Sequence, residues 1–303
     1  MVHYSSRKGI ALLLTLMFVI VMSVAVGYTL TKVKNASHIL QREKQLYQNS
    51  MILEDILHIL QNSRQLQNIL GNKPIDSLYL FLSTTKNIPF KLQNSKVLLF
   101  ISSARERFNI NELNKANEPF VREYFSKMMV SNNYVNVLKD CMSKNQVKNR
   151  YNTYNSVIFD EHPYLFREYI ASKKQLSIIN NFYLNEYNDD NIKRIDFDKL
   201  FSFSGNLNEN IDLNYATPEV LMLILNTTRE RADEIYTLPK PFHFIKDLKL
   251  SADEKVALSK FKTSFFEPYI HIKIEIMRDK ERSIISFDYD IKSKQGSNFV
   301  FSI

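Results

Sequence analysis

An uncharged apolar run near the N-terminus, from Ile10 to Leu30, constrains this chain more than any other stretch. As an α-helix, a run of about 21 residues spans about 31 Å, which matches the hydrocarbon core of a bilayer. A short basic leader ending in Arg7, Lys8 and Gly9 stands directly before it. We therefore predict a membrane-spanning helix whose N-terminal end faces the cytoplasm.

The helical pattern continues beyond the apolar run. Between Lys32 and Leu60, apolar side chains recur at steps of mostly three to five residues. This spacing predicts an amphipathic helix that extends the membrane span without interruption to about Ile69. Gly71 is the expected C-cap residue, and Pro74 is expected to keep the helix from continuing.

Alternating apolar and polar residues mark the C-terminal part as β structure. The alternation covers Tyr269 to Ile276, Ser283 to Ile291, and the end of the chain from Phe299 to Ile303. An earlier apolar run, Lys96 to Ile101, also has the character of a strand. We expect these strands to form one antiparallel sheet, with one face exposed to water and the other packed on the N-terminal helix.

A largely helical segment, about Asn109 to Thr263, is predicted between the β regions. Within it, Thr217 is a good helix N-cap, Pro218 suits the first helical position, and Glu219 suits the positive end of the helix dipole. A second helix is predicted to begin near Arg229, with one more short helix after it.

The composition fits a folded chain that uses neither a disulfide nor a phosphate-binding loop. Of 303 residues 45% are apolar, enough for a core in one or two domains. The net charge is +8, or +6 once Arg7 and Lys8 leave with the leader (8 − 2), and it is dispersed as on a solvated surface. Five glycines are too few for Gly-rich phosphate loops. Cys141, the single cysteine, is predicted to be a buried residue of a helix.

No group of residues in the sequence stands out above chance as a catalytic site. None of the six histidines lies in an H-E-x-x-H frame, and His243 and His271 are expected to be surface or packing residues. Asp288 and Asp290 have a paired-carboxylate spacing, but an exposed sheet face is expected there. The stretch from Asn185 to Asn191 has oxygen ligands suited to a hard cation, although such clusters are usually loops. We therefore predict that the chain is not an enzyme and holds no cofactor.

Residues 213–219 also resemble the opening of helix-hairpin-helix domains that bind DNA, which would give the chain a nucleic-acid partner. Those domains need a Gly-containing hairpin, since only Gly lets the backbone N–H groups approach a phosphate closely. Here Asn226, Thr227 and Thr228 stand at the hairpin. The sequence therefore predicts no nucleic-acid partner.

The leader and apolar run resemble the N-terminus of type IV pilins and pseudopilins, in which a prepilin peptidase cuts after the Gly of a short basic leader. The resemblance places the cut between Gly9 and Ile10. Most members carry Glu at the fifth mature position, where this chain has Leu14. Absence of that Glu is typical of one subfamily, the general secretion pathway protein K (GspK) family of minor pseudopilins.

Two further motifs resemble the helical insert of that family. One is a strand end of the form RFN-apolar-N, and the other is a helix start of the form apolar-N-x-A-T/S-x-E-apolar-L that is followed by a Pro-Phe segment. The residues that match are Arg107, Phe108, Asn109, Asn111, Asn214, Ala216, Thr217, Glu219, Leu221, Pro241 and Phe242. With the N-terminus and the C-terminal strands, the resemblance covers nearly the whole chain in order.

The resemblance implies an α+β fold. In it, a long N-terminal transmembrane helix packs on an antiparallel, pilin-like sheet, and a large helical, SAM-like insert lies between the sheet's strands. The implied parts are a leader (1–9), the N-terminal helix (10–70), the first part of the α/β domain (71–108), the insert (109–263) and a β meander (264–303).

The implied function is to initiate and cap the periplasmic pseudopilus of a type II secretion system. The implied protein spans the inner membrane once, holds its C-terminal domain in the periplasm and undergoes prepilin cleavage and methylation. Its implied partners are the I-type and J-type minor pseudopilins and the major pseudopilin. Because Leu14 cannot pair with a neighbour's N-terminal amine, a place at the filament tip is implied. Calcium has little support, because the chain has no Trp and lacks the family's Asp-rich segment that contains one.

Alternatives to this interpretation remain open from the residues. A plain signal-anchor helix would show the same apolar run, and a cleaved secretory signal could end at Ser23-Val24-Ala25. A minor pilin of a type IV pilus or competence filament would share the N-terminus but not the two-part insert. The mature N-terminus separates several of these, because Ile10 indicates a pilin-type cut and Met1 or Val26 does not.

Overall fold

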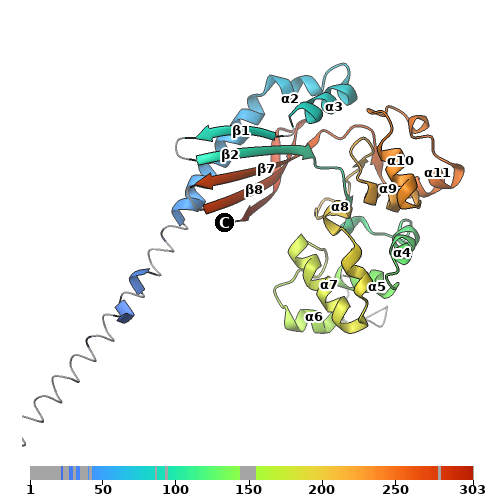
Figure 1. Ribbon diagram of the computed structural model, residues 1–303, viewed down its shortest axis with the longest axis horizontal. Helices are drawn as coiled ribbons and strands as arrows, with labels where there is room; N and C mark the ends of the chain where they lie inside the picture. The colour runs from blue at the N-terminus through green and yellow to red at the C-terminus, as the bar shows by residue number, and fades with distance from the viewer. Residues whose placement is uncertain are drawn as a thin grey trace, which may run out of the picture. The chain divides into compact units, whose positions relative to one another are not determined.

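The computed structural model (Figure 1) describes residues 43–85, 87–92, 95–143, 155–278 and 281–302, and also 22, 27–29, 32–34 and 40. The chain divides into two compact units, Met1–Ile59 and Leu60–Ile303. Among the described residues, no helix combines the length and the apolar character that a bilayer span requires. Most of the predicted membrane span, the Gly9–Ile10 cut and Leu14 lie outside the described residues.

The amphipathic helix is present but is interrupted. Residues 43–62 are helical, and Ile52, Leu53 and Ile56 are buried. At Ser63 the backbone leaves the helical conformation (φ −69°, ψ 114°), and the Ser63 side chain caps a new helix, α2 (Arg64–Ile69). The prediction of an uninterrupted helix to Ile69 is therefore wrong at Ser63. The predicted C-cap is also wrong, because Leu70 occupies that position and Gly71 does not have a positive φ.

Pro74 opens a helix that the sequence did not predict, α3 (Pro74–Thr84), in which it takes the first helical position. Leu78 and Leu82 of α3 are buried, and the helix contacts both α2 and strand β2. Pro74 therefore ends one helical segment and starts the next.

One five-stranded antiparallel sheet is the centre of the unit Leu60–Ile303. Its spatial order is β1-β2-β7-β8-β9 (Figure 1). The strands are β1 (Asn87–Leu92), β2 (Ser95–Ser103), β7 (Tyr269–Arg278), β8 (Glu281–Asp290) and β9 (Gln295–Ser302). The predicted meander and its junction with the strand near Val97 are confirmed, whereas β1 was not predicted.

The register explains which face of the sheet is buried. Leu99 of β2 faces Ile274 of β7, Ile274 faces Ile285 of β8, and Ile285 faces Phe301 of β9. The alternate residues of the central strands form the buried face: Val97, Leu99, Ile101, Ile270, Ile272, Ile274, Ile276, Ile285, Phe287 and Tyr289. The opposite face carries polar residues, as the period-two pattern requires.

All remaining helices lie between β2 and β7 in the chain. Figure 1 shows them in two groups, α4–α7 and α9–α11, with α8 between. They are α4 (Glu118–Lys127), α5 (Asn133–Cys141), α6 (Asn155–Glu161), α7 (Lys173–Tyr187), α8 (Phe197–Leu200), α9 (Pro218–Leu225), α10 (Arg229–Tyr236) and α11 (Ala252–Leu258). Three short 3₁₀ helices, η1 (Ile110–Glu112), η2 (Asp190–Arg194) and η3 (Ile245–Leu248), join them.

Both helical groups share one buried cluster, which runs through the chain from Phe108 to Phe261. Aromatic rings fill its centre: the Phe125 and Tyr134 rings meet edge to face at 4.8 Å, and those of Tyr134 and Tyr183 at 5.1 Å. Cys141 is fully buried in this cluster, as predicted. The helical groups therefore form one folded insert.

Two short parallel strand pairs tie this insert together. Strand β3 (Phe108–Asn109) pairs with β4 (Phe201–Ser202), and β5 (Ile211–Asp212) pairs with β6 (Thr263–Ser264). The predicted α+β class, with an antiparallel sheet and a helical insert, is thus confirmed. The transmembrane part of that prediction lies outside the described residues.

A stacked pair of phenylalanines offers a test of the sheet's burial. Phe287 is fully buried and Phe299 is 42% exposed, although their rings stack at 5.3 Å. Phe287→Ala should lower the free energy of unfolding by about 3–5 kcal/mol, because it leaves a cavity. Phe299→Ala should cost less than about 1.5 kcal/mol. Urea denaturation of the detergent-solubilised chain, followed by circular dichroism, measures both. Equal losses would contradict this assignment of the buried face.

Candidate functional site

Asn109 and Asn111 of the first motif are buried or half-buried side chains that hold distant backbone segments. The Asn109 amide nitrogen donates to the carbonyl oxygens of Ser204 (3.1 Å) and Asn206 (3.0 Å). The Asn111 side chain both donates to the carbonyl of Ile170 (3.0 Å) and accepts from its N–H (2.8 Å). Both side chains therefore form hydrogen bonds with backbone groups of the insert that have no partner in a helix or a strand.

Asn214 of the second motif has the same role at the other side of the insert. Its side-chain oxygen accepts from the N–H of Phe242 (2.6 Å), and its nitrogen donates to the carbonyls of Phe242 (3.1 Å) and Phe265 (2.9 Å). It is 2% exposed. One amide thus joins the entry to α9, the Pro-Phe segment and the segment that leads back to β7.

The other residues of the second motif shape the start of α9. Ala216 is fully buried. The Thr217 hydroxyl accepts from the N–H of Val220 as an N-cap and donates to the carbonyl of Lys199 (2.7 Å). Glu219 is buried, and its carboxylate forms an ion pair with Arg229 of α10 at 2.8 Å. The residues of both motifs thus serve as structural connections within the insert.

A buried ion pair, which the sequence did not reveal, lies where the chain leaves the sheet. Arg105 follows β2, and its guanidinium contacts Glu209 at 3.0 Å, with both side chains less than 9% exposed. The same guanidinium lies 4.1 Å from the centre of the Tyr269 ring at the start of β7. The Glu209 N–H donates to the Glu112 carboxylate at 2.8 Å. Arg105 therefore links the exit from the sheet, the return to it and the insert.

Asp212 completes this junction. Its carboxylate is fully buried and accepts from the N–H groups of Asn214 and Glu267, both at 3.0 Å. Burial raises the pKa of Asp212 to about 7, although the two hydrogen bonds oppose the shift. Nearby Lys240 shows the reverse effect, because burial lowers its pKa to about 8 while the Asp212 charge opposes this.

The expectation that Asp288 lies on an exposed sheet face is wrong. Its side chain is 17% exposed and accepts from Asn298 of β9 at 2.8 Å, while one carboxylate oxygen lies 2.7 Å from His271 Nδ1 on β7. Burial favours a higher pKa for Asp288, but the His271 and Asn298 interactions lower it overall. The alternation correctly put Asp288 on the polar face. It could not show that neighbouring strands cover it.

The stretch from Asn185 to Asn191 was noted above for oxygen ligands suited to a cation. Its Asp189 carboxylate is already engaged in hydrogen bonds within the chain. Asp189 accepts from the Tyr183 hydroxyl (2.6 Å), the Ser131 N–H (2.9 Å) and the Asn191 side chain (3.0 Å). Among the residues that the structure describes, no group of three or more His, Cys, Asp or Glu side chains could hold a metal ion. Burial raises the pKa of Cys141 to about 12, so this thiol is not activated.

The hairpin between α9 and α10 has no Gly but still turns tightly. Asn226 adopts a left-handed conformation (φ 51°), and its N–H and that of Thr227 donate to the carbonyls of Leu223 and Met222. Glu123 of α4 also accepts from the Asn226 side chain at 2.8 Å. These two N–H groups are committed within the helix end, and Lys127 of α4 also donates to the Asn226 carbonyl (2.8 Å), so a carboxylate and an ammonium both contact the turn.

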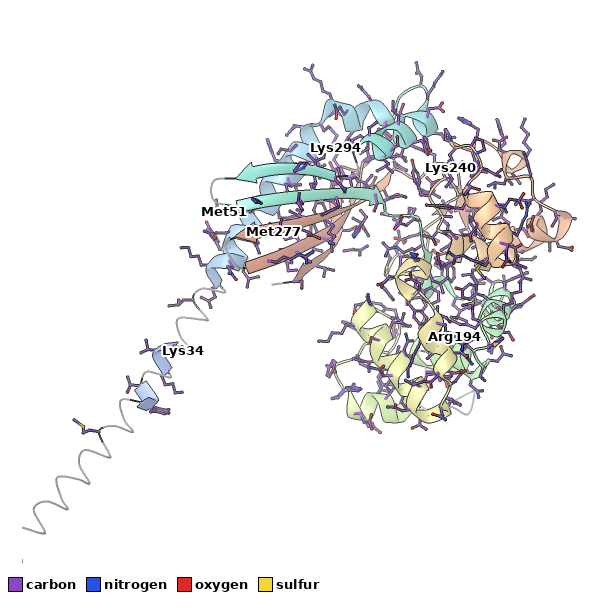
Figure 2. All side chains as sticks on the ribbon, viewed as in Figure 1. Lys34, Met51, Arg194, Lys240, Met277 and Lys294 are labelled. Atoms are coloured by element: carbon purple, nitrogen blue, oxygen red, sulfur yellow. The ribbon has the colours of Figure 1, made fainter. Side chains whose placement is uncertain are left out.

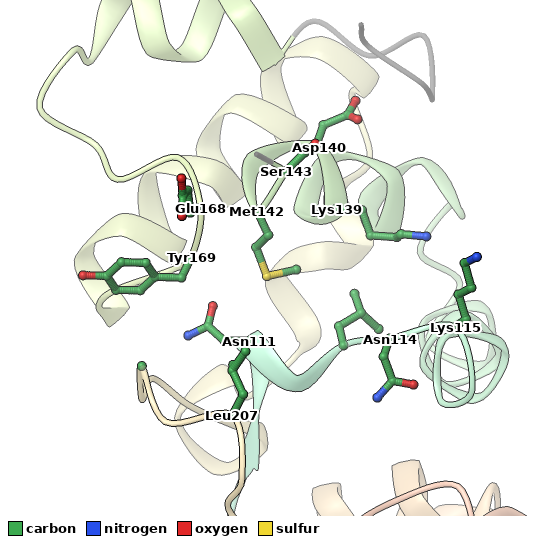
Figure 3. Close-up of a pocket in the computed structure, with 12 residues that line it drawn as sticks. Asn111, Asn114, Lys115, Lys139, Asp140, Met142, Ser143, Glu168, Tyr169 and Leu207 are labelled. Carbon is green, nitrogen blue, oxygen red and sulfur yellow. The ribbon is translucent and has the colours of Figure 1, made fainter. Parts of the chain in front are cut away.

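A cavity of about 780 Å³ lies between the first helical group and the segments that carry Asn111 and Leu207. Figure 3 shows Asn111, Met142, Tyr169 and Leu207 around it. Asp140 also lines it, and burial raises the Asp140 pKa to about 6. The Asn111 side chain, which lines this cavity, already forms hydrogen bonds with the backbone of Ile170. The cavity therefore lies beside the first motif.

The free edge of β9 is the clearest candidate surface for another protein. Phe299, Val300 and Phe301 are 42%, 58% and 41% exposed. The strand has no charged residue and no Pro, whereas the sequence of the opposite edge, β1, includes Pro89 and Lys91. Edge strands usually carry charges or Pro that prevent pairing, and β9 lacks this protection. An extended strand of a partner could therefore add to the sheet here.

Asn214 gives a direct test of the junction. Asn214→Ala removes three hydrogen bonds and leaves buried backbone groups of Phe242 and Phe265 without partners, so it should lower the free energy of unfolding by about 3 kcal/mol or more. Asn132→Ala is the matched control, because Asn132 is exposed and its side chain caps nothing. The control should change stability by less than about 0.5 kcal/mol. A loss for Asn214→Ala as small as the control's would contradict the structural role.

Asp212 predicts a pH dependence of stability. Its folded pKa of about 7 lies above the ordinary value of 3.8, so its stabilising contribution is present below about pH 4 and is lost as the pH rises towards 7. Carboxylates whose folded pKa is lowered are ionised throughout the range from about pH 5 to 7. They therefore do not make the unfolding free energy rise with pH in this range. The unfolding free energy of the wild type should fall across this range by up to about 1.4 kcal/mol per pH unit per proton. Asp212→Asn should be less stable overall but show a shallower slope, which denaturation at several pH values would measure. An unchanged slope would contradict the assignment to Asp212.

Among the comparisons with known proteins, the one with solved structures gives a match. No family model matches the sequence, and no curated protein matches it either. The fold is similar to that of a chain in the crystal structure of the GspK-GspI-GspJ complex from the type 2 secretion system of enterotoxigenic Escherichia coli, with a TM-score of 0.55 and 11% sequence identity. The match covers 87% of this chain and 99% of that one. The chain therefore has a GspK-like α+β fold, and the resemblance drawn from the sequence is confirmed at the level of the fold.

Proposed function

We propose that this chain is a minor pseudopilin of a type II secretion system, of the K type. The observation that carries the proposal is the insertion of one helical body between β2 and β7 of an antiparallel sheet. The likeness to a chain of the GspK-GspI-GspJ complex, over 87% of this chain, supports it. The leader with Gly9 and the apolar run beginning at Ile10 support it independently.

The proposed mechanism is assembly. The helix that begins at Ile10 anchors the chain in the inner membrane, the prepilin peptidase removes residues 1–9, and the folded part stands in the periplasm. A Glu at the fifth mature position would pair with a neighbour's N-terminal amine, because an unpaired charge in lipid is costly. Leu14 makes no such pair, and the bulk of the insert hinders packing inside a filament. Both features suit a subunit that caps the tip and starts the pseudopilus.

The proposed partners are the I-type and J-type minor pseudopilins, followed by the major pseudopilin. The uncharged edge of β9, with Phe299, Val300 and Phe301 exposed, supports protein partners over nucleic acid. The absence of an enzyme activity and of a nucleic-acid partner stays a prediction. In this proposal the chain acts by binding its neighbouring pseudopilin subunits in a fixed order.

One experiment tests processing and assembly together. The chain is co-expressed with a prepilin peptidase and with the I-type and J-type subunits of the same system, extracted in mild detergent and purified through a C-terminal tag. Mass spectrometry should find a mature N-terminus at Ile10, and both companion subunits should co-purify. Leu14→Glu should be cut normally but should reduce recovery of the complex or secretion, because it buries an extra charge.

The controls distinguish processing from assembly. Gly9→Val should leave the leader attached. Phe287→Ala shows how much assembly suffers when only the folded part that contains the sheet is destabilised. A mature N-terminus at Met1 or Val26, or normal assembly with subunits of a type IV pilus and none with the I and J types, would contradict the proposal. If Leu14→Glu alters neither complex formation nor secretion, the tip argument from Leu14 fails.

A further inference from the structure

A second cavity, of about 630 Å³, lies where the sheet meets the second helical group. Aromatic side chains from three elements line it: Tyr79 of α3, Phe100 of β2, Tyr236 of α10, and Tyr215 from the turn before α9. The rings of Tyr79 and Tyr215 are 6.5 Å apart. Hydroxyl and amide groups, including those of Ser83, Asn87, Ser102 and Thr237, complete the lining. Its size and mixed lining are those of a ligand site.

Lys240, labelled in Figure 2, is the one basic residue among the described residues that line this cavity. Its ammonium lies 4.3 Å from the centre of the Tyr236 ring and 5.9 Å from that of Phe242. In the described part of the chain, no carboxylate lies within ion-pair distance of it, whereas other lysines, such as Lys173 and Lys193, form ion pairs with a carboxylate. A half-buried ammonium whose direct contacts in the described residues are aromatic rings attracts an anion.

The acidic groups nearby do not supply that anion. The Asp212 carboxylate accepts two backbone N–H groups and is fully buried. Glu106 lines the cavity, and burial raises its pKa, although Arg107 and His271 oppose this. Neither forms an ion pair with Lys240. Asp212 therefore acts on Lys240 only at a distance, and the ammonium is left for direct contact with a carboxylate of a partner.

The edge of β2 indicates what kind of molecule fits. In the described residues, the pairing of β1 with β2 ends at Asn87 opposite Phe100, but β2 continues to Ser103. Residues 100–103 line the cavity. An extended peptide can lie along such a strand and place alternate side chains into pockets. A peptide that carries a carboxylate next to an aromatic group would meet Lys240 and the tyrosines together.

We propose that this cavity is a peptide-binding site. It takes an extended segment of a protein partner in which an Asp or Glu side chain stands beside an aromatic residue. Lys240 binds the carboxylate, and Tyr79, Tyr215 and Tyr236 hold the aromatic ring. The proposal does not depend on which filament or secretion system the chain belongs to.

The electrostatics of Lys240 give this site a pH signature. Burial lowers the Lys240 pKa to about 8, so its charge is lost just above neutral pH when the site is empty. Glu106 lines the same cavity, the Asp212 charge acts on Lys240, and burial raises the pKa of Tyr215 above its ordinary value. A carboxylate at Lys240 should therefore bind less well as the pH rises above about 8.

The absence of tryptophan from the chain allows a clean assay. The probe is the acetylated and amidated peptide Gly-Glu-Trp-Gly, whose indole fluorescence is excited where tyrosine does not absorb. Titrated with the full chain in detergent, it should bind with a dissociation constant below about 1 mM. The peptide Gly-Gln-Trp-Gly should bind about 10- to 100-fold more weakly, since it lacks the charge.

Matched variants assign the effect to Lys240. Lys240→Met should remove the preference for Glu over Gln. Lys240→Arg should keep that preference and abolish the loss of binding above pH 8. Lys246→Met is the control, because Lys246 lies 5.0 Å over the Phe244 ring in a similar pair but does not line the cavity. The control should bind as the wild type does, and circular dichroism should show that all variants are folded.

Three outcomes would overturn the proposal. Equal affinity for the Glu and Gln peptides would remove the role of the carboxylate. Unchanged binding by a folded Lys240→Met variant would remove the role of Lys240. Binding only of Gly-Gly-Trp-Gly with a free C-terminus would assign the site to a chain end and contradict a side-chain carboxylate. None of these outcomes bears on cleavage at Gly9 or on co-purification of companion subunits, so the two proposals fail separately.

Discussion

The central constraint on this fold is that a large helical insert begins and ends on neighbouring strands of one sheet. The chain leaves β2 at Ser103 and returns in β7 at Tyr269, and β2 pairs directly with β7. The two ends of the insert must therefore lie side by side, whatever happens between them. Arg105 meets this requirement, because one guanidinium contacts Glu209 in the insert and the Tyr269 ring at the return.

The connections at this junction are polar because irregular backbone passes through a buried region. Segments without helix or sheet pairing still need partners for their N–H and C=O groups. Asn109, Asn111 and Asn214 provide them, since an amide side chain donates and accepts as a peptide bond does. A buried pair such as Arg105–Glu209 adds little net stability against its desolvation, but loss of one partner is costly. Such contacts therefore favour one arrangement of the insert over others, and they add little to its net stability.

Much of the fold could be predicted from periodicity, because strands and caps are local. Pro74 shows where local reasoning fails: the same residue that stops one helix is suited to start another. Strand β1 was missed because it is short and contains Pro89, which is acceptable only at an edge. The motif containing Asn214 was recognised, but its partner Phe265 is distant in sequence and no spacing reveals it. The burial of Asp288 depends on the neighbouring strands, so its own strand could not show it.

Scarcity of glycine has a further consequence for how this chain turns. Among the described residues every positive φ belongs to a residue other than Gly, and Asn188 and Asn226 take the left-handed position at the ends of α7 and α9. Asn adopts this conformation more readily than most residues, since its side chain bonds the local backbone. Absence of Gly therefore did not prevent a tight hairpin at Asn226. The N–H groups of Asn226 and Thr227 are bonded within this hairpin, and the Asn226 side chain contacts both Glu123 and Lys127 of α4. The same helix-turn-helix geometry thus serves to pack α4 against α9.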